Sequence, residues 1–179
     1  MNKFVLFVAI VFKVAFSFGQ TDTLFWFVAP EVAQSHGDRP IVLRFATLNT
    51  AATITISQPA NPAFPIQIIN IGINAAQTLD LTPWIDITEN KPPNTILPFG
   101  FKIVSTTPIM AYYEVTPTCN CNPDIFTLKG KNSIGTQFIV PFQNFLNNAA
   151  YARSGFDIVA TQNNTTVTIN PKNDIVGHP

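Results

Sequence analysis

Short stretches of alternating apolar and polar residues recur along most of the chain. Residues 53–57 read Thr-Ile-Thr-Ile-Ser, and residues 77–81 read Gln-Thr-Leu-Asp-Leu. A two-residue period sends successive side chains to opposite faces, which is typical of β-strands with one buried face. No stretch after Gln20 sustains the 3.6-residue period of an amphipathic helix. The pattern therefore predicts an all-β protein.

Eight strands are expected between breaks that contain proline or asparagine. Besides residues 53–57 and 77–81, the predicted strands are Phe25–Ala29, Ile41–Phe45, Ile66–Ile71, Phe99–Ile103, Ile109–Val115 and Ile125–Leu128. Breaks fall at Asn61-Pro62, Pro92-Pro93 and Thr116-Pro117. Many short strands at this spacing favour an Ig-like antiparallel β-sandwich.

The chain also resembles itself at a constant offset. Thr23-Leu24-Phe25-Trp26-Phe27-Val28 is similar to Thr136-Gln137-Phe138-Ile139-Val140, and Thr53-Ile54-Thr55-Ile56 is similar to Thr166-Val167-Thr168-Ile169. Both matches lie 113 residues apart, which indicates a tandem duplication. We expect a first module over residues 20–133 and the start of a second over residues 134–179. The second would be too short to close its own sheet, so the sequence is expected to be a fragment of a longer protein.

The first 19 residues have the layout of a signal peptide. Lys3 precedes an apolar run from Phe4 to Phe12, and the small residues Ser17 and Gly19 stand at the −3 and −1 positions of a cut before Gln20. Lys13 interrupts the run before it reaches the ~20 apolar residues of a membrane span. We therefore expect cleavage, export to the cell surface or the extracellular space, and no stable membrane insertion afterwards.

Charge narrows the classes of partner. The whole chain carries 10 basic and 10 acidic residues, and without Lys3 and Lys13 the remainder has 8 basic and 10 acidic residues. No cluster of Lys and Arg is present, so nucleic acid is not an expected partner. The expected partner is an extracellular protein or a glycan of unknown identity.

Residues 35–40, Ser-His-Gly-Asp-Arg-Pro, form the most polar stretch. A nucleophilic triad needs Ser, His and Asp converging from separate elements, whereas here they are nearly consecutive. No Gly-x-Ser-x-Gly elbow is present. We expect no catalytic residues and no enzyme activity. The segment is either a structural loop or a ligand-contact loop, and its weak candidate ligand residues are His36, Asp38 and Arg39.

No metal or cofactor site is predicted. His36 and His178 are the only histidines, and no zinc-ligand spacing is present. Asp80, Asp86, Glu89 and Asn90 could offer oxygens to Ca²⁺, but turn residues that cap strand ends are the expected role.

Cys119 and Cys121 are the only cysteines. Residues two apart have Cα atoms at most ~7 Å apart, which is at the limit of disulfide geometry. A strained disulfide between them, free thiols and links to other chains all remain open.

Aromatic residues could form a sugar-stacking platform or belong to the core. Trp26, Trp84, Tyr112 and Tyr113 are the candidates. Strand aromatics more often pack in a core or pair across strands. Trp84 follows the alternation of Leu79 and Leu81 and precedes Ile85, so we expect it to anchor the end of the core.

Several segments resemble, in order, the IgGFc-binding protein N-terminal domain family. They are Phe25–Glu31, His36–Pro40, Thr53–Pro59, Asp80–Trp84, Pro108–Glu114, Phe126–Gly130, Phe138–Gln143 and Phe156–Thr161. The resemblance covers Leu24 to His178, and Cys119-Asn120-Cys121 looks like a local departure from the pattern.

The resemblance implies an extracellular, adhesion-like β-rich domain near the start of a larger surface protein, with no catalytic residues to carry over. Bacterial relatives commonly end in a secretion-sorting domain, which this sequence does not contain. Fold similarity does not transfer antibody Fc as a partner. The expected function is therefore extracellular binding or adhesion. A carbohydrate-binding module of a larger secreted enzyme is the alternative.

Overall fold

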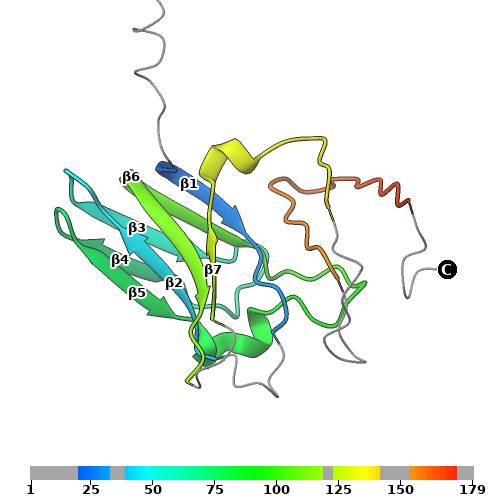
Figure 1. Cartoon of the computed structure of the whole chain (residues 1–179), viewed down its shortest axis with the longest axis horizontal. Coiled ribbons are helices and arrows are strands. Elements are labelled where there is room, and N and C mark those ends of the chain that lie inside the picture. The colour runs from blue at the N-terminus through cyan, green and yellow to red at the C-terminus, as the bar shows by residue number, and fades with distance from the viewer. Residues whose placement is uncertain (1–19, 33–38, 119–122, 142–153, 173–179) are drawn as a thin grey trace, which may run out of the picture.

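The computed structural model describes residues 20–32, 39–118, 123–141 and 154–172. The described strands are β1 (Asp22–Phe27), β2 (Ile41–Ala46), β3 (Ala52–Ser57), β4 (Gln67–Ile71), β5 (Ala76–Asp80), β6 (Phe101–Val115) and β7 (Asp124–Thr127). Two short 3₁₀ helices are described, η2 (Thr82–Ile87) and η3 (Gly130–Ser133). The expectation of an all-β fold is confirmed (Figure 1).

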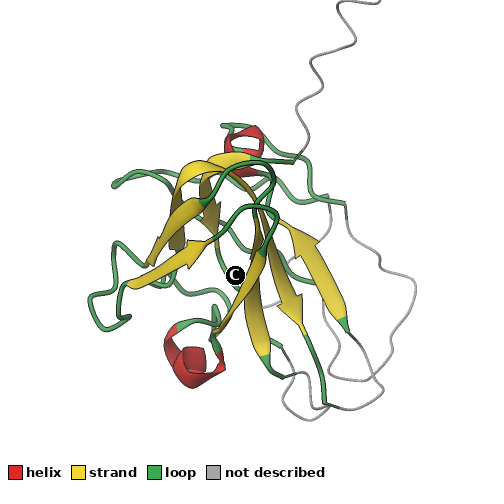
Figure 2. Cartoon of the chain, turned by 90° about the vertical axis from the view of Figure 1, so that its left-hand side faces the viewer, coloured by secondary structure: helices red, strands yellow, loops and turns green. Residues whose placement is uncertain are grey.

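All strand pairs are antiparallel, and the strand order is β4-β3-β6-β2-β5, with β1 and β7 also pairing with β6. The N-terminal half of β6 pairs with β3 and β1, and its C-terminal half pairs with β2 and β7. One long strand therefore belongs to two layers. We call β4, β3, β1 and the first half of β6 the first layer, and β5, β2, β7 and the second half of β6 the second layer. Figure 2 shows strands on two sides of a common interior.

The predicted strands Phe99–Ile103 and Ile109–Val115 are one 15-residue strand in the structure. Residues 104–108 were left outside both predicted strands, and this segment contains Pro108, which cannot donate a ladder hydrogen bond. Side chains supply bonds there instead: the Ser105 hydroxyl donates to the Thr107 carbonyl at 2.7 Å, and the Thr107 hydroxyl donates to the Ala51 carbonyl at 3.0 Å. The chain therefore passes from one layer to the other without a turn.

The core lies between the layers and follows the predicted alternation. In β3 the inward residues are Ala52, Ile54 and Ile56, and the intervening threonines face outward. Ile109, Ala111, Tyr113 and Val115 are all buried, as their shared face predicted. Phe64 meets Phe101 edge-to-face, with their ring centroids 5.1 Å apart. The sandwich is therefore held by apolar side chains from both layers.

The predicted second module is not visible as strands in the described residues. Residues 134–141 and 154–172, which include the repeats of β1 and β3, contain no described strand. Two contacts join them to the sandwich: Asn90 donates to the Asp157 carboxylate, and a Cβ on Gly100 would lie 2.9 Å from a Val159 methyl. The tandem duplication and the boundary at residue 133 stay predictions.

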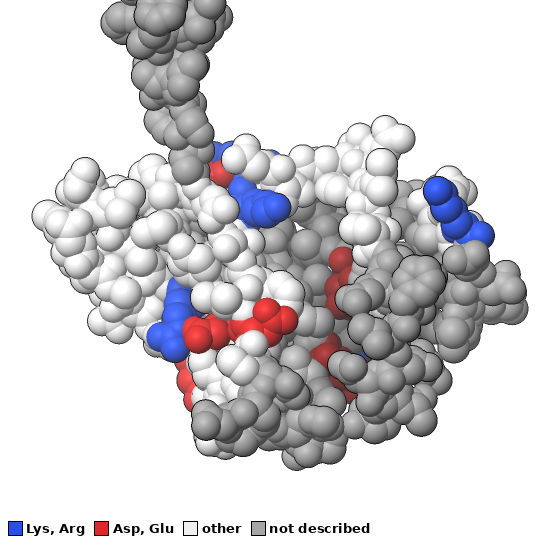
Figure 3. Space-filling model, in the orientation of Figure 1, with Lys and Arg blue, Asp and Glu red and all other residues white. Residues whose placement is uncertain are grey.

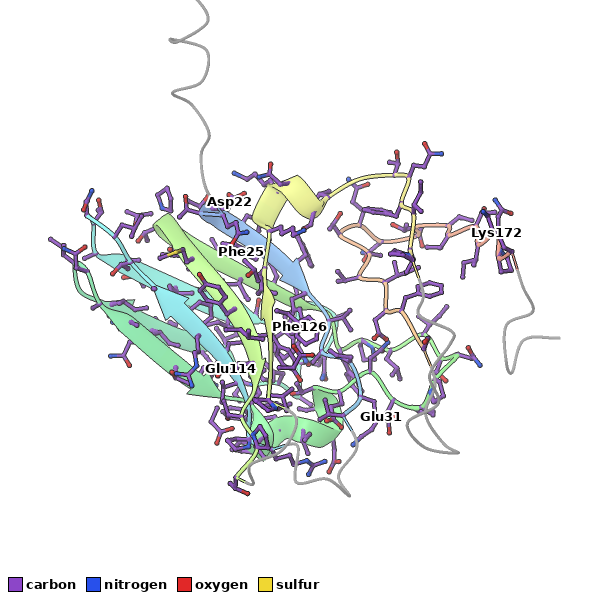
Figure 4. The ribbon with its side chains drawn as sticks, viewed as in Figure 1. Asp22, Phe25, Glu31, Glu114, Phe126 and Lys172 are labelled. Carbon is purple, nitrogen blue, oxygen red and sulfur yellow. The ribbon has the colours of Figure 1, made fainter. Side chains whose placement is uncertain are left out.

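A carboxylate fastens the start of β1 to η3. One oxygen of Asp22 accepts the Lys131 backbone N–H at 2.7 Å, and the other accepts the Thr23 N–H at 2.7 Å and lies 3.4 Å from the Lys131 ammonium. Gly130, which directly precedes Lys131, has φ +58°, and a Cβ at this position would lie 2.5 Å from the Asp22 Cβ. Glycine is therefore required at 130 both for the backbone conformation and for the close approach. We call this arrangement the Asp22 clasp; Asp22 is labelled in Figure 4.

Asp22→Asn is expected to lower the free energy of unfolding by about 1–2 kcal/mol at neutral pH, because charged hydrogen bonds to backbone N–H groups become neutral ones. Burial raises the pKa of Asp22, but the backbone hydrogen bonds from Lys131, Thr23 and Leu24 and the Lys131 charge outweigh it and lower the pKa. A lowered pKa stabilises the fold above the unfolded-state value of 3.8, and this stabilisation is lost as pH falls through the folded-state pKa. Urea unfolding of both proteins at several pH values tests this. The gap should close at acidic pH, and a gap independent of pH would contradict the assignment.

Candidate ligand-binding site

The most unusual polar residue of the described chain is Glu89, which is fully buried. One carboxylate oxygen lies 2.9 Å from the Lys91 ammonium, and the other accepts the Val32 backbone N–H at 3.4 Å. The Lys91 side chain is 27% exposed, so the pair reaches from the interior to the surface. A buried carboxylate needs such partners, because its desolvation costs several kcal/mol.

The helix η2 places Glu89 at the end of the sandwich. Pro83 stands in its first turn and Ile85 is its buried residue. The Glu89 N–H donates to the Ile85 carbonyl at 3.0 Å, and the Asn90 N–H donates to the Ala29 carbonyl at 2.9 Å. A parallel bridge also joins Ala29 to Glu89. The segment after η2 is thereby fixed against the segment after β1.

The two residues that flank residues 33–38 both interact with the Glu89–Lys91 pair, Val32 by a hydrogen bond and Arg39 through its charge. Val32, on one side, donates its backbone N–H to Glu89. The pKa of Lys91 is raised, mainly because its ammonium donates a hydrogen bond to Glu89. The positive charge of Arg39, on the other side of residues 33–38, opposes this rise. Arg39 is half-buried, and its Nε is buried without a hydrogen-bond partner in the described part. Of the three predicted ligand residues, only Arg39 is among the described residues, and its positive charge acts on Lys91.

Tyr113 brings a further polar group into the core on this side. Its side chain is fully buried, and its hydroxyl has no hydrogen-bond partner among the described residues. Burial raises the pKa of Tyr113, and the negative charge of Glu89 raises it further. The Thr88 hydroxyl is likewise buried without a described partner. Burial therefore keeps the Tyr113 hydroxyl protonated, and no described residue forms a hydrogen bond with it.

Tyr113→Phe is expected to raise the free energy of unfolding by about 1 kcal/mol, because it removes an unpaired buried hydroxyl and keeps the ring. The ring contacts with Phe27 and Phe126, at centroid distances of 4.8 and 6.1 Å, should persist. Guanidinium unfolding at neutral pH measures the change. Tyr112→Phe is the matched control, since the Tyr112 side chain lies on the opposite face of β6. A loss of stability in Tyr113→Phe would mean that the hydroxyl has a partner.

The other candidate residues are distributed as follows. His36 and Asp38 lie in residues 33–38, and Cys119 and Cys121 lie in residues 119–122, all outside the described residues. Asp80 caps the turn before η2, because its carboxylate accepts the Thr82 N–H at 2.8 Å. The exposed Asp86 carboxylate and the buried Glu89 carboxylate both lie near the Lys91 ammonium, at 3.7 and 2.9 Å, so Lys91 bridges them. Within the described ranges, no three His, Cys, Asp or Glu side chains are grouped to hold a metal ion.

Both tryptophans are half-buried and each has a described neighbour at its ring. Trp84 is partly buried, packs against the core and meets Phe64 edge-to-face, with their ring centroids 5.4 Å apart. It therefore lies at the margin of the core rather than inside it. The Lys102 ammonium lies 5.6 Å from the Trp26 ring centroid, which is a cation–π distance.

Sequence reasoning counted Glu89 only as a turn residue. The available signal was an acid that follows the apolar pair Ile85 and Ile87 and stands two residues before Lys91. Its burial depends on Val32, 57 residues earlier, and this contact is not visible in a local pattern.

Comparison with known proteins bears on the C-terminal third of the chain. A family model described as IgGFc binding protein matches residues 124–179. The IgGFc-binding resemblance is confirmed over this range. The match starts at β7, which pairs with β6, so the matched segment contributes a strand to the sandwich. Residues 20–123, where part of the resemblance was also seen, lie outside the match.

Other comparisons add little. A solved structure titled "Crystal Structure of Thermotoga maritima 1070" is 14% identical, with a TM-score of 0.37, and the similarity covers 60% of this chain and 96% of that one. A likeness at this score carries no argument about the fold. The search of curated proteins found no match. None of the helices in the described residues is long and apolar enough to span a membrane.

Proposed function

We propose that the chain is a non-catalytic binding protein of the IgGFc-binding type that works outside the cell or on its surface. The IgGFc-binding match to residues 124–179 is the observation that carries this proposal. The leader of residues 1–19 supports export, and a cut before Gln20 would leave two residues ahead of β1. The partner is a protein presented in the extracellular space.

The residues on either side of residues 33–38 support a ligand-contact role for this segment. The ion pair of Glu89 and Lys91 fixes one flank of residues 33–38 through Val32, and Arg39 lies at the other flank. Loops that contact partners are commonly carried by a rigid scaffold. Partner contact through this loop is part of the proposal.

Surface plasmon resonance with immobilised antibody Fc tests the proposal, with Fab fragments as the matched control surface. Selective Fc binding that weakens in Arg39→Ala is the supporting result. Binding to a glycan array instead of proteins would favour the carbohydrate-binding alternative. N-terminal sequencing of the protein recovered from the culture medium tests export, and an intact Met1 in a cytoplasmic product would count against it.

A further inference from the structure

Each layer has two edge strands, β4 and β1 in the first and β5 and β7 in the second. An edge strand can pair with another chain, and proteins prevent this with charges, prolines, bulges or short strands. β7 has only four residues and starts at Asp124, β5 ends in Asp80, and β1 has a register shift and is fastened to η3 by the Asp22 clasp. β4 pairs with β3 over five consecutive residues without a shift and has none of these protections.

The surface around β4 is uncharged. Residues 45–79, which include all of β3 and β4, contain no Asp, Glu, Lys or Arg. Figure 3 shows no charged group at the left end of the molecule, where Figure 1 places these two strands. On the inward side of β4, Ile69 packs against the core but is only partly buried. A strand added at this edge would therefore desolvate no charge and could cover Ile69.

Residues 165–170, Thr-Thr-Val-Thr-Ile-Asn, have the pattern of a strand but belong to no described strand. Val167 is 47% exposed and Ile169 is 46% exposed, and the backbone groups of this segment are bonded to no other described segment. Residues 166–169 also resemble residues 53–56 of β3. Because β3 is the strand that pairs with β4, the chain carries a second, unpaired segment with the side-chain pattern that β4 accepts.

The register of β3 on β4 shows how this second segment would fit on the open side. Thr53 stands opposite Asn70, and the next residue of β3 stands opposite Ile69. The same antiparallel register would place Thr166 opposite Asn70 and Val167 opposite Ile69, on the inward side. The carboxamide oxygen of Asn70 accepts the Thr53 hydroxyl at 2.7 Å. This bond does not use the amide NH₂ group of Asn70, which can donate to the Thr166 hydroxyl.

Within one copy the two elements lie far apart. Figure 1 places β4 at the left end of the molecule and residues 154–172 at the right end. The side-chain hydrogen bond from Asn90 to Asp157 and the close approach of Val159 to Gly100 hold the C-terminal segment on that side. Pairing between residues 165–170 and β4 therefore joins different copies.

We propose that residues 165–170 of one copy add as a strand to the open edge of β4 of another copy, so that copies associate head to tail. Strand addition binds through main-chain hydrogen bonds, and alternate side chains select the partner. Donor and acceptor are different surfaces, so each copy can donate and accept at once, and the assembly need not close. The proposal concerns contacts between copies and does not depend on the proposed binding of an extracellular partner.

Sedimentation velocity of the protein as isolated, from about 10 μM to 1 mM, tests the proposal, because weak contacts of small area associate in this range. The average mass should rise with concentration and exceed that of two copies. Val167→Pro/Thr168→Pro should weaken the association at least about tenfold, since the N–H groups of consecutive strand residues point to opposite sides and one of the two must face β4. The matched control is Ile139→Pro/Val140→Pro, in the other exposed strand-like segment, and should leave the association unchanged.

The acceptor is tested separately. Ile69→Lys puts a charge on the inward side of β4, where the donor strand would cover it, and should also weaken the association at least about tenfold. Gln77→Lys, on the exposed edge strand β5 of the other layer, is its control and should have no effect. An equal mixture of Ile69→Lys with the donor variant Val167→Pro/Thr168→Pro contains one intact donor and one intact acceptor. It should form a species of two copies and none larger.

Thermal melting of each variant separates association from folding. The donor variant should melt as the native protein does, because residues 165–170 lie outside the sandwich, so this arm holds even if Ile69→Lys lowers the melting temperature. A native protein that stays monomeric at about 1 mM would overturn the proposal. Equal weakening by the donor variant and Ile139→Pro/Val140→Pro would overturn it as well, because the association would not then depend on residues 165–170. Weakening by Gln77→Lys equal to that by Ile69→Lys would exclude β4 as the acceptor.

Discussion

Phe101→Ala is expected to lower the free energy of unfolding by about 3–5 kcal/mol, the largest effect that we predict for a single substitution. Phe101 is fully buried at the start of β6, where it contacts Phe64 edge-to-face and stacks on Phe27 with ring centroids 6.3 Å apart. The rings of Phe27 and Phe64, on two separate segments, would lose their common neighbour, and the remaining space would stay partly empty. Equilibrium unfolding in urea measures the change.

Leu48→Ala is the control for Phe101→Ala, because Leu48 is a large apolar residue that is 49% exposed. Its replacement should change the free energy of unfolding by no more than about 0.5 kcal/mol. A cost below about 1 kcal/mol for Phe101→Ala would show that the two layers do not depend on this ring.

Lys91→Met should lower the free energy of unfolding by about 2–4 kcal/mol, since it leaves the buried Glu89 carboxylate without its cation. We do not expect the full free-energy cost of breaking a completely buried ion pair, because the Lys91 side chain is 27% exposed and water can reach the site. The hydrogen bond from the Val32 backbone N–H to the same carboxylate should also weaken. Hydrogen exchange of the Val32 amide, together with urea unfolding, measures both parts.

The double variant Glu89→Gln/Lys91→Met separates the charge from the packing. The neutral amide can still accept the Val32 N–H, so the double variant should be more stable than Lys91→Met alone. A double variant that is less stable than Lys91→Met would mean that Glu89 contributes through contacts other than its ion pair.

The strands were predictable from sequence because alternation is a local property. Ile54 and Ile56 face inward and Thr53 and Thr55 face outward, as the period-two pattern requires. The continuity of β6 was not predicted, because residues 104–108, which include Pro108, were left between two separate strands. Whether such a segment turns or continues depends on which side chains can replace the missing ladder bonds, and here the Thr107 hydroxyl reaches the Ala51 carbonyl.

The candidate site was only partly predictable for a related reason. The polar residues 35–40 are conspicuous in the sequence, and Arg39 is near the buried ion pair. Glu89 looked like an ordinary turn residue, because its environment is made by Val32 and by the opposing layer through Tyr113. A single carboxylate that is buried by residues distant in the sequence produces no periodic pattern along the chain.

The Asp22 clasp has a mechanical consequence. The chain enters the sandwich at Asp22 and leaves β7 for η3 at Lys131, and these two points are bonded to each other. Tension applied along the polypeptide from either side would therefore load the clasp first and would pull little on the hydrophobic interior. The sandwich would then lie outside the part of the chain that carries the force until the clasp opened.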